Sequence, residues 1–190
     1  MAIDKITMLD LIVQSNKVDE SKELIFILAP ELKRLVGFDQ KHPHHDLDAW
    51  DHTMKAMDEL GMTDLESMMA MLFHDISKPV VFVEGEDGVR HYPDHPKVSA
   101  NMTREILKRI GYKDAFINNV CYLVETHDTP INIEKMDNSM DMIQKRLRIQ
   151  YADSRAHKKE FVQKRIDFLD RISQDLEEKK NKKVEDDYLK

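Results

Sequence analysis

Apolar residues recur every three or four positions along most of this chain, which is the spacing of amphipathic helices. The first six predicted helices cover 5–14, 21–36, about 47–60, 64–78, 96–110 and about 114–127. A seventh begins after Pro130, carries Met136, Met140, Ile143 and Leu147, and continues past Asp153. The last runs from Phe161 to Ile172. Pro30 should break or kink the second helix, because proline has no backbone N–H to donate. The pattern therefore predicts an all-α fold, a helical bundle.

A short β-hairpin is the one departure from this helical pattern. Residues 80–92, VVFVEGEDGVRHY, place β-favouring residues on both sides of a turn that contains glycine and aspartate. No internal repeat or linker divides the rest of the chain. We expect a single domain over residues 1–175, followed by a frayed tail of mixed charge over 176–190, where little apolar surface is available for burial.

The helix predicted over 64–78 carries the most informative polar residues. Thr63 and Glu66 have the spacing of a capping box, so the helix should begin at Asp64. It is apolar almost all round through Phe73, and Pro79 should end it, with His74, Asp75 and Lys78 on its last turn. Burying such side chains unpaired costs several kcal/mol. They must therefore face solvent, pair with each other, or share a cation.

Other histidines and aspartates stand in strongly patterned segments. His52 lies opposite the apolar stripe of its helix, between Ala49 and Ala56, where small neighbours leave room for another helix or a metal. Taken alone, His52 is a common core or surface residue, His95 a capping residue of a loop, and Asp153 a solvated carboxylate. His127 extends the apolar face of the helix 114–127. Taken together, they favour a shared cation.

Composition and charge limit the possible functions. The chain of 190 residues is 41% hydrophobic and 34% charged, which is normal for a globular protein. Its net charge of −7 argues against broad nucleic-acid binding, although a metal with local lysines and arginines still permits a small anionic substrate. The sequence has a single cysteine, Cys121, and shows neither a signal peptide pattern nor a long apolar run. We therefore expect a cytoplasmic protein without membrane contact.

These residues resemble the HD superfamily of metal-dependent phosphohydrolases, an all-helical fold named for its His-Asp doublet. The resemblance covers about residues 35–160, the predicted metal-binding core, and its central motif here is LFHDISKP. It implies that His52, His74, Asp75 and Asp153 form the metal site. In two-metal members two further histidines join the site, which here are His95 and His127, with Asp75 as the bridge between the ions.

Within that superfamily the chain is most similar to the HD domain of bacterial tRNA nucleotidyltransferases. The similar stretches are HHDLDAWDHTM, LFHDISKP, the hairpin followed by HPKVSANMTREILKRI, and YADSRAH. The nucleotidyltransferase head domain has no counterpart in this sequence, so we expect a stand-alone domain without CCA addition. The resemblance implies only the hydrolytic activity of the HD part, on phosphomonoesters and cyclic nucleotide phosphates.

The ligand types fit that chemistry. Nitrogen and oxygen donors without a thiolate suit one or two ions of Mn, Fe, Co, Ni, Zn or Mg. Such an ion lowers the pKa of bound water, and the hydroxide can attack phosphorus. We expect Asp75 and Lys78 to be catalytic, with Lys78 stabilising charge on the phosphoryl oxygens; the competing interpretation is that Lys78 is a simple cation at a helix C-terminus. Lys97 and Arg104 are candidate substrate-binding residues, or part of a solvated helix face.

Several residues have no assigned role. His44 and His45 precede the helix of His52 and could line the cleft. His42, His91 and His157 are interpreted as surface residues. Cys121 lies on an apolar stripe and is interpreted as a small core residue.

Three functions are consistent with these residues. The leading hypothesis is a metal-dependent phosphohydrolase for a small phosphorylated substrate, such as a nucleotide, acting as a phosphomonoesterase or cyclic phosphodiesterase. A mixed-valence di-iron oxygenase of the same fold is the second. The third is a metal- and nucleotide-binding adaptor without catalysis. Hydrolysis of guanosine tetraphosphate is disfavoured, because Ser77–Lys78 replaces the acidic pair that usually follows the doublet. The sequence leaves the substrate, native metal and oligomeric state open.

Overall fold

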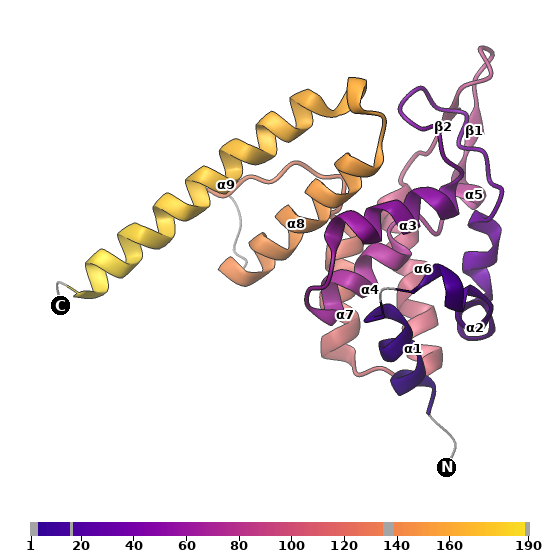
Figure 1. Cartoon of the computed structure of the whole chain (residues 1–190), viewed down its shortest axis with the longest axis horizontal. Coiled ribbons are helices and arrows are strands. Elements are labelled where there is room, and N and C mark those ends of the chain that lie inside the picture. Colours follow the sequence, from indigo (N-terminus) through magenta and orange to yellow (C-terminus); the bar gives the residue numbers. More distant parts are fainter. Residues whose placement is uncertain (1–3, 16, 135–138, 189–190) are drawn as a thin grey trace.

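A computed structural model describes residues 4–15, 17–134 and 139–188, with side chains described as far as residue 181. In these parts the chain is mostly helical, which confirms the all-α prediction (Figure 1). The α-helices are α1 (Lys5–Val13), α2 (Lys22–Leu28), α3 (Ala49–Leu60), α4 (Leu65–Phe73), α5 (Lys78–Val81), α6 (His95–Ile110), α7 (Asp114–Glu125), α8 (Met140–Ala156) and α9 (Lys159–Tyr188). Two short 3-10 helices are η1 (Asp19–Ser21) and η2 (Pro30–Leu35).

The break predicted at Pro30 is confirmed. Helix α2 ends at Leu28, and η2 begins at Pro30, where the missing N–H of proline costs nothing because the first turn of a helix has no partner for it. Leu32 and Leu35 of η2 are fully buried. The change of helix type therefore turns the chain while its apolar side chains stay in the core.

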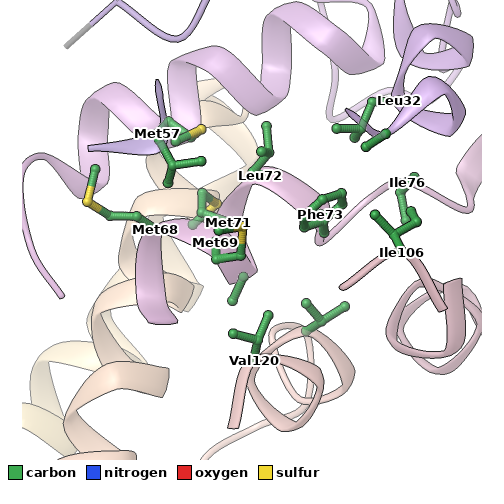
Figure 2. Packing of buried hydrophobic residues seen from close by; sticks show 14 of the residues in the cluster. Leu32, Met57, Met68, Met69, Met71, Leu72, Phe73, Ile76, Ile106 and Val120 are labelled. Atoms are coloured by element: carbon green, nitrogen blue, oxygen red, sulfur yellow. The ribbon is translucent and has the colours of Figure 1, made fainter. Parts of the chain in front are cut away.

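Helix α4 lies at the centre of the main core. Every residue from Ser67 to Phe73 is buried. Figure 2 shows its side chains surrounded by residues of neighbouring helices, such as Ile106 of α6 and Val120 of α7. A helix that is apolar on all sides can be stable only where other helices cover it. This packing holds the C-terminal end of α4, and the polar residues that follow it, inside the protein.

The predicted ends of this helix need correction. Its N-cap is Asp64, whose carboxylate accepts from the backbone N–H of Ser67 at 3.0 Å, so Thr63 and Glu66 do not form the expected capping box. The helix ends at Phe73, and Pro79 does not terminate it. Instead Pro79 lies in the first turn of α5, a position that proline tolerates. The His-Asp doublet and Lys78 are therefore separated by a turn rather than carried on one helix.

The hairpin is confirmed, although it is shorter than the apolar run suggested. Strands β1 (Val83–Glu84) and β2 (Arg90–His91) are antiparallel, and Val83 lies opposite His91. The backbone N–H of Arg90 donates to the carbonyl of Lys41 at 2.9 Å. This bond attaches the hairpin to the histidine-rich loop that precedes α3.

Helices α8 and α9, together with Ile131 of the segment that precedes α8, form a second, smaller apolar cluster. Its buried members are Ile131, Ile143, Leu147, Leu169, Ile172 and Leu176. Figure 1 shows α9 turning back at the end of α8, running alongside it and extending away from the other helices. The predicted boundary at residue 175 falls within α9, beside the buried Leu176, and the division into one domain and a frayed tail stays a prediction. Met136 lies outside the described residues.

Candidate metal centre

The six donors predicted from the sequence come together at one place. They arrive from separate elements: His52 from α3, His74 from the C-cap of α4, Asp75 from the turn after it, His95 from the first residue of α6, His127 from the segment after α7, and Asp153 from α8. All are buried except His95, whose side chain is 13% exposed. His52 and Asp153 are 101 positions apart in the chain, and they meet because α3 packs against α8.

An inner donor set consists of His52, His74, Asp153 and the Oδ2 atom of Asp75. His52 Nε2 lies 3.1 Å from Asp153 Oδ1, and His74 Nε2 lies 3.2 Å from Asp75 Oδ2. The two crossing distances are 3.6 Å from His74 Nε2 to Asp153 Oδ1 and 3.7 Å from His52 Nε2 to Asp75 Oδ2. One donor atom from each of His52, His74 and Asp153 lies within 4.8 Å of the others, close enough to surround one ion.

An outer donor set consists of His95, His127 and the other oxygen of Asp75. Asp75 Oδ1 lies 3.4 Å from His95 Nε2 and 3.9 Å from His127 Nε2, and the two nitrogens are 3.3 Å apart. Oδ1 has no hydrogen-bond partner among the described residues, and Oδ2 forms an ion pair with Lys78 Nζ at 2.7 Å. A buried carboxylate whose two oxygens face two groups of imidazoles suits a bridge between two cations.

The imidazole rings are oriented as metal-binding histidines usually are. In three of them Nδ1 contacts the backbone carbonyl three residues earlier, at 2.6 to 3.1 Å. The pairs are His74 with Met71, His95 with Tyr92, and His127 with Val124. Because a carbonyl only accepts, each Nδ1 carries a proton, so Nε2 is the nitrogen that faces Asp75 and that can bind a cation when it is unprotonated. Nδ1 of His52 is the exception, since it has no partner among the described residues.

Burial and neighbouring charge set the protonation of the centre. Burial lowers the pKa of His52 to about 4, and burial together with the charge of His74 lowers the pKa of His127 to about 4. Burial opposes the charged form of His74 too, but the Asp75 and Asp153 carboxylates outweigh it and raise the pKa of His74 to about 10. Burial likewise opposes ionisation of Asp75, yet His74 and Lys78 hold its pKa well below the usual value. Two ionised carboxylates therefore attract positive charge to this position.

A cavity of about 440 Å³ opens onto the donors. Seven of the chain's nine histidines line it, and the other two, His52 and His74, are buried beside it. The lining residues include Asp75, His95, His127 and Asp153, with His42, His44, His45, His91 and His157 around them. His44 and His45 lie where the sequence suggested. His42, His91 and His157 were interpreted as surface residues only, and no local pattern indicates that their separate segments meet at this cavity.

Of the three cationic residues predicted to act on the substrate, one lines the cavity and two do not. Lys78 lines the cavity and is only 5% exposed, with Nζ donating to Gln40 Oε1 at 2.8 Å. Lys97 is exposed and Arg104 donates to Asn118 at 2.7 Å, and neither is among the residues that line the cavity. Arg165 of α9 lines it instead. The only sequence signal for Arg165 is its position one turn after Phe161, which lines the same cavity.

The HD domain family model matches residues 44–177, and the chain belongs to that family. Membership places it in a superfamily of metal-dependent hydrolases, and the two donor sets are of the kind that binds divalent cations. The chain is also similar to an A-adding tRNA nucleotidyltransferase of Deinococcus radiodurans, with 33% identity over 113 residues, and to a CC-adding tRNA nucleotidyltransferase of Thermus thermophilus, with 34% identity over 109 residues. The matches cover 57% and 55% of this chain.

These relatives are much longer than the matched region. The alignments span 26% of the first and 25% of the second, so the chain corresponds to about a quarter of each relative's length. The similarity to the HD part of tRNA nucleotidyltransferases predicted from the sequence is thereby confirmed. None of the described helices is both long enough and apolar enough to cross a bilayer.

Proposed function

We propose that this protein is a metal-dependent phosphohydrolase that acts on small phosphate esters, nucleotides among them. One observation carries the proposal: the Asp75 carboxylate stands between two groups of donors, with Oδ2 facing the inner set and Oδ1 the outer set. Both oxygens are buried, and the carboxylate lines the cavity. Oδ2 has Lys78 as its ion-pair partner, whereas Oδ1 has no hydrogen-bond partner among the described residues. Two ions held a few ångströms apart by a shared carboxylate are a common arrangement in phosphate-ester hydrolases.

Each donor residue has a place in one of two ion sites, and Asp75 belongs to both. His52, His74, Asp75 and Asp153 would hold one ion, and Asp75, His95 and His127 a second. With nitrogen and oxygen donors only, the site suits Mn, Fe, Co, Ni, Zn or Mg. The backbone carbonyls that contact Nδ1 of His74, His95 and His127 keep three rings in the binding orientation before any ion arrives.

When bound, the ions would polarise the phosphate oxygens and activate water for attack on phosphorus. The surrounding residues bind and orient the ester. Lys78 and Arg165 place positive charge on the cavity wall, and Phe161 and Val162 add an apolar side that a base or another ring could contact. Lys78 is the proposed stabiliser of developing phosphoryl charge, because its buried ammonium lies beside Asp75. A cavity of about 440 Å³ suits a mononucleotide better than a folded nucleic acid.

The test is hydrolysis by protein loaded with each candidate ion in turn. A generic phosphate monoester, a 2′,3′-cyclic nucleotide and a panel of nucleotides should give phosphate release or ring opening with at least one metal, and Asp75→Asn should abolish it. Ion binding without turnover of any ester would favour the adaptor. Oxygen consumption with a mixed-valence iron signal would favour the oxygenase.

A further inference from the structure

The ring of His45 is held by a buried glutamine. Gln40 is 1% exposed, and its Oε1 accepts from Lys78 Nζ at 2.8 Å. Its Nε2 lies 3.4 Å from the carbonyl of Leu47 and 3.1 Å from Nδ1 of His45. An ammonium group only donates and a carbonyl only accepts, so both contacts require this one orientation of the amide. Gln40 therefore donates to His45.

This contact determines which nitrogen of His45 carries the proton. Nδ1 must accept from Gln40, so the proton of the neutral ring is on Nε2. His45 is half-buried and lines the cavity, and its ring centroid is 4.9 Å from that of His52 in the inner donor set. The ring thus offers a fixed N–H donor beside the metal centre.

His157 shows the opposite arrangement. Its Nδ1 lies 2.8 Å from the backbone carbonyl of Asp153, so its Nε2 keeps a lone pair, as in the metal-binding histidines. His45, His52 and His157 have nitrogens within 4.8 Å of one another, which would be compatible with a third ion. His45 has no lone pair to give to such an ion, because one nitrogen accepts from Gln40 and the other is protonated. The geometry favours a hydrogen-bonding role for His45 over a ligand role.

We propose that His45 is a substrate-binding residue whose Nε2–H donates to an oxygen of the phosphate group bound at the metal centre. Gln40 is then a positioning residue that acts through His45, and Lys78 fixes Gln40. Phosphate oxygens only accept hydrogen bonds, so a histidine locked as a donor is complementary to them. This inference rests on the proposed function for its ligand, whereas the proton position of His45 follows from the contacts of Gln40 alone.

The substitution Gln40→Glu tests the proton position directly. A carboxylate can still accept from Lys78, but it can only accept from His45, so the proton should move to Nδ1. Side-chain ¹⁵N NMR of the zinc-loaded protein should show the Nε2–H form of His45 in the wild type and the Nδ1–H form in Gln40→Glu, with His45→Gln identifying the signal. The control Gln174→Glu makes the same charge change at an exposed position of α9 and should leave the signal unchanged. An Nδ1–H form in the wild type would overturn the inference.

Kinetics and binding test the contact with phosphate. His45→Ala and Gln40→Glu should each raise KM for a phosphate monoester, and Kd for inorganic phosphate, by about tenfold or more, since a hydrogen bond to a charged group is lost. Bound metal should stay the same. His45→Gln, whose amide can donate from nearly the same place, should recover part of the loss. Unchanged KM and Kd, or loss of an ion in His45→Ala, would overturn the inference.

The two proposals fail in different ways. If the wild type hydrolyses no ester, the proposed function fails, but the Kd for inorganic phosphate and the NMR signal still test His45. If the wild type is active and these variants match it, the role of His45 fails and the hydrolase remains.

Discussion

The floor and the rim of the cavity are both rich in histidine, yet they are built in different ways. We call the six donor residues the floor. The rim comprises Phe161 and Arg165 of α9 and the five other cavity histidines, His42, His44, His45, His91 and His157. On the floor, three rings are fixed by backbone carbonyls within the same turn. On the rim, His157 also has a backbone carbonyl at Nδ1, but His45 depends on the side chain of Gln40, and the ring centroid of His44 lies 4.8 Å from that of Phe161. Orientation by the backbone survives most substitutions, whereas orientation by a side chain changes with one residue.

Removing one charge from the floor should have the largest effect. Asp75→Asn keeps the shape of the side chain but removes the anion that both donor sets share, so ion binding should weaken at both. We expect activity to fall at least ~100-fold, because even groups that merely orient a metal ligand contribute 10–100-fold. Elemental analysis and turnover measure this. Asp114→Asn, the same change at an exposed position of α7, is the control. Equal metal content and activity in Asp75→Asn would contradict the bridged centre.

The outer donor set can be removed by itself. The double variant His95→Ala, His127→Ala should lose one ion and keep the other, because the inner set remains complete. Metal content per protein should fall by half, and hydrolysis should fall steeply. His44→Ala, on the rim, should keep the full metal content. An unchanged metal content in the double variant would show that His95 and His127 contact the substrate rather than an ion.

The rim can be loosened without touching the floor. Leu169 is fully buried between α8 and α9, and α9 also supplies Phe161 and Arg165 to the cavity wall. Leu169→Ala should weaken this packing by about 2–5 kcal/mol. We expect faster amide hydrogen exchange in α9 and a several-fold higher KM, with metal content unchanged. Leu11→Ala, at a position that is 58% exposed, is the control. Loss of metal in Leu169→Ala would mean that floor and rim are not separable.

The smallest expected effect lies at the other end of α4, away from the cavity. Burial opposes the charge of Asp64, but hydrogen bonds from Ser67 and the charge of Lys145 outweigh it and hold the pKa of Asp64 below its usual value. A lowered pKa in the folded state means that Asp64 stabilises the fold above its unfolded pKa of about 3.9, and that this stabilisation is lost as pH falls through the folded pKa.

Asp64→Ala should therefore lower the free energy of unfolding by about 1 kcal/mol at pH 7, the usual contribution of an N-cap. The difference from the wild type should shrink on going to pH 3. Urea unfolding of both metal-free proteins measures it. Asp64→Asn, which keeps an N-cap acceptor, should lose less at pH 7. A deficit in Asp64→Ala that grows as pH falls would contradict the assigned pKa direction.

The floor could be predicted from the sequence because each donor belongs to a strongly patterned helix or helix end. The apolar run before His74 leaves no exposed position for the doublet, and the order of the remaining donors matched a known family. The end of α4 was misplaced, since proline was interpreted only as a stop and here begins the next helix. That error did not affect which residues meet at the centre.

The rim could not be predicted, because it depends on contacts between distant segments. The bond from Arg90 to Lys41 brings the hairpin beside the loop before α3, and so places His91 near His42, with ring centroids 6.5 Å apart. Arg165 reaches the cavity only because α9 turns back at the end of α8. Lys97 and Arg104 share α6 with His95, but one residue is solvated and the other bonds to α7. No local pattern distinguishes these outcomes.

The buried carboxylate of Asp75, placed between the two donor sets, has a consequence for the stability of this protein in a cell. A ligand that binds only the folded chain raises the free energy of unfolding. The increase grows with the logarithm of the free ligand concentration and is about 4 kcal/mol when that concentration is a thousand times Kd. A cation bound by the buried carboxylates would therefore make the stability of the folded protein depend on the supply of that metal ion. Starvation for the native ion would then lower the abundance of the protein as well as its turnover.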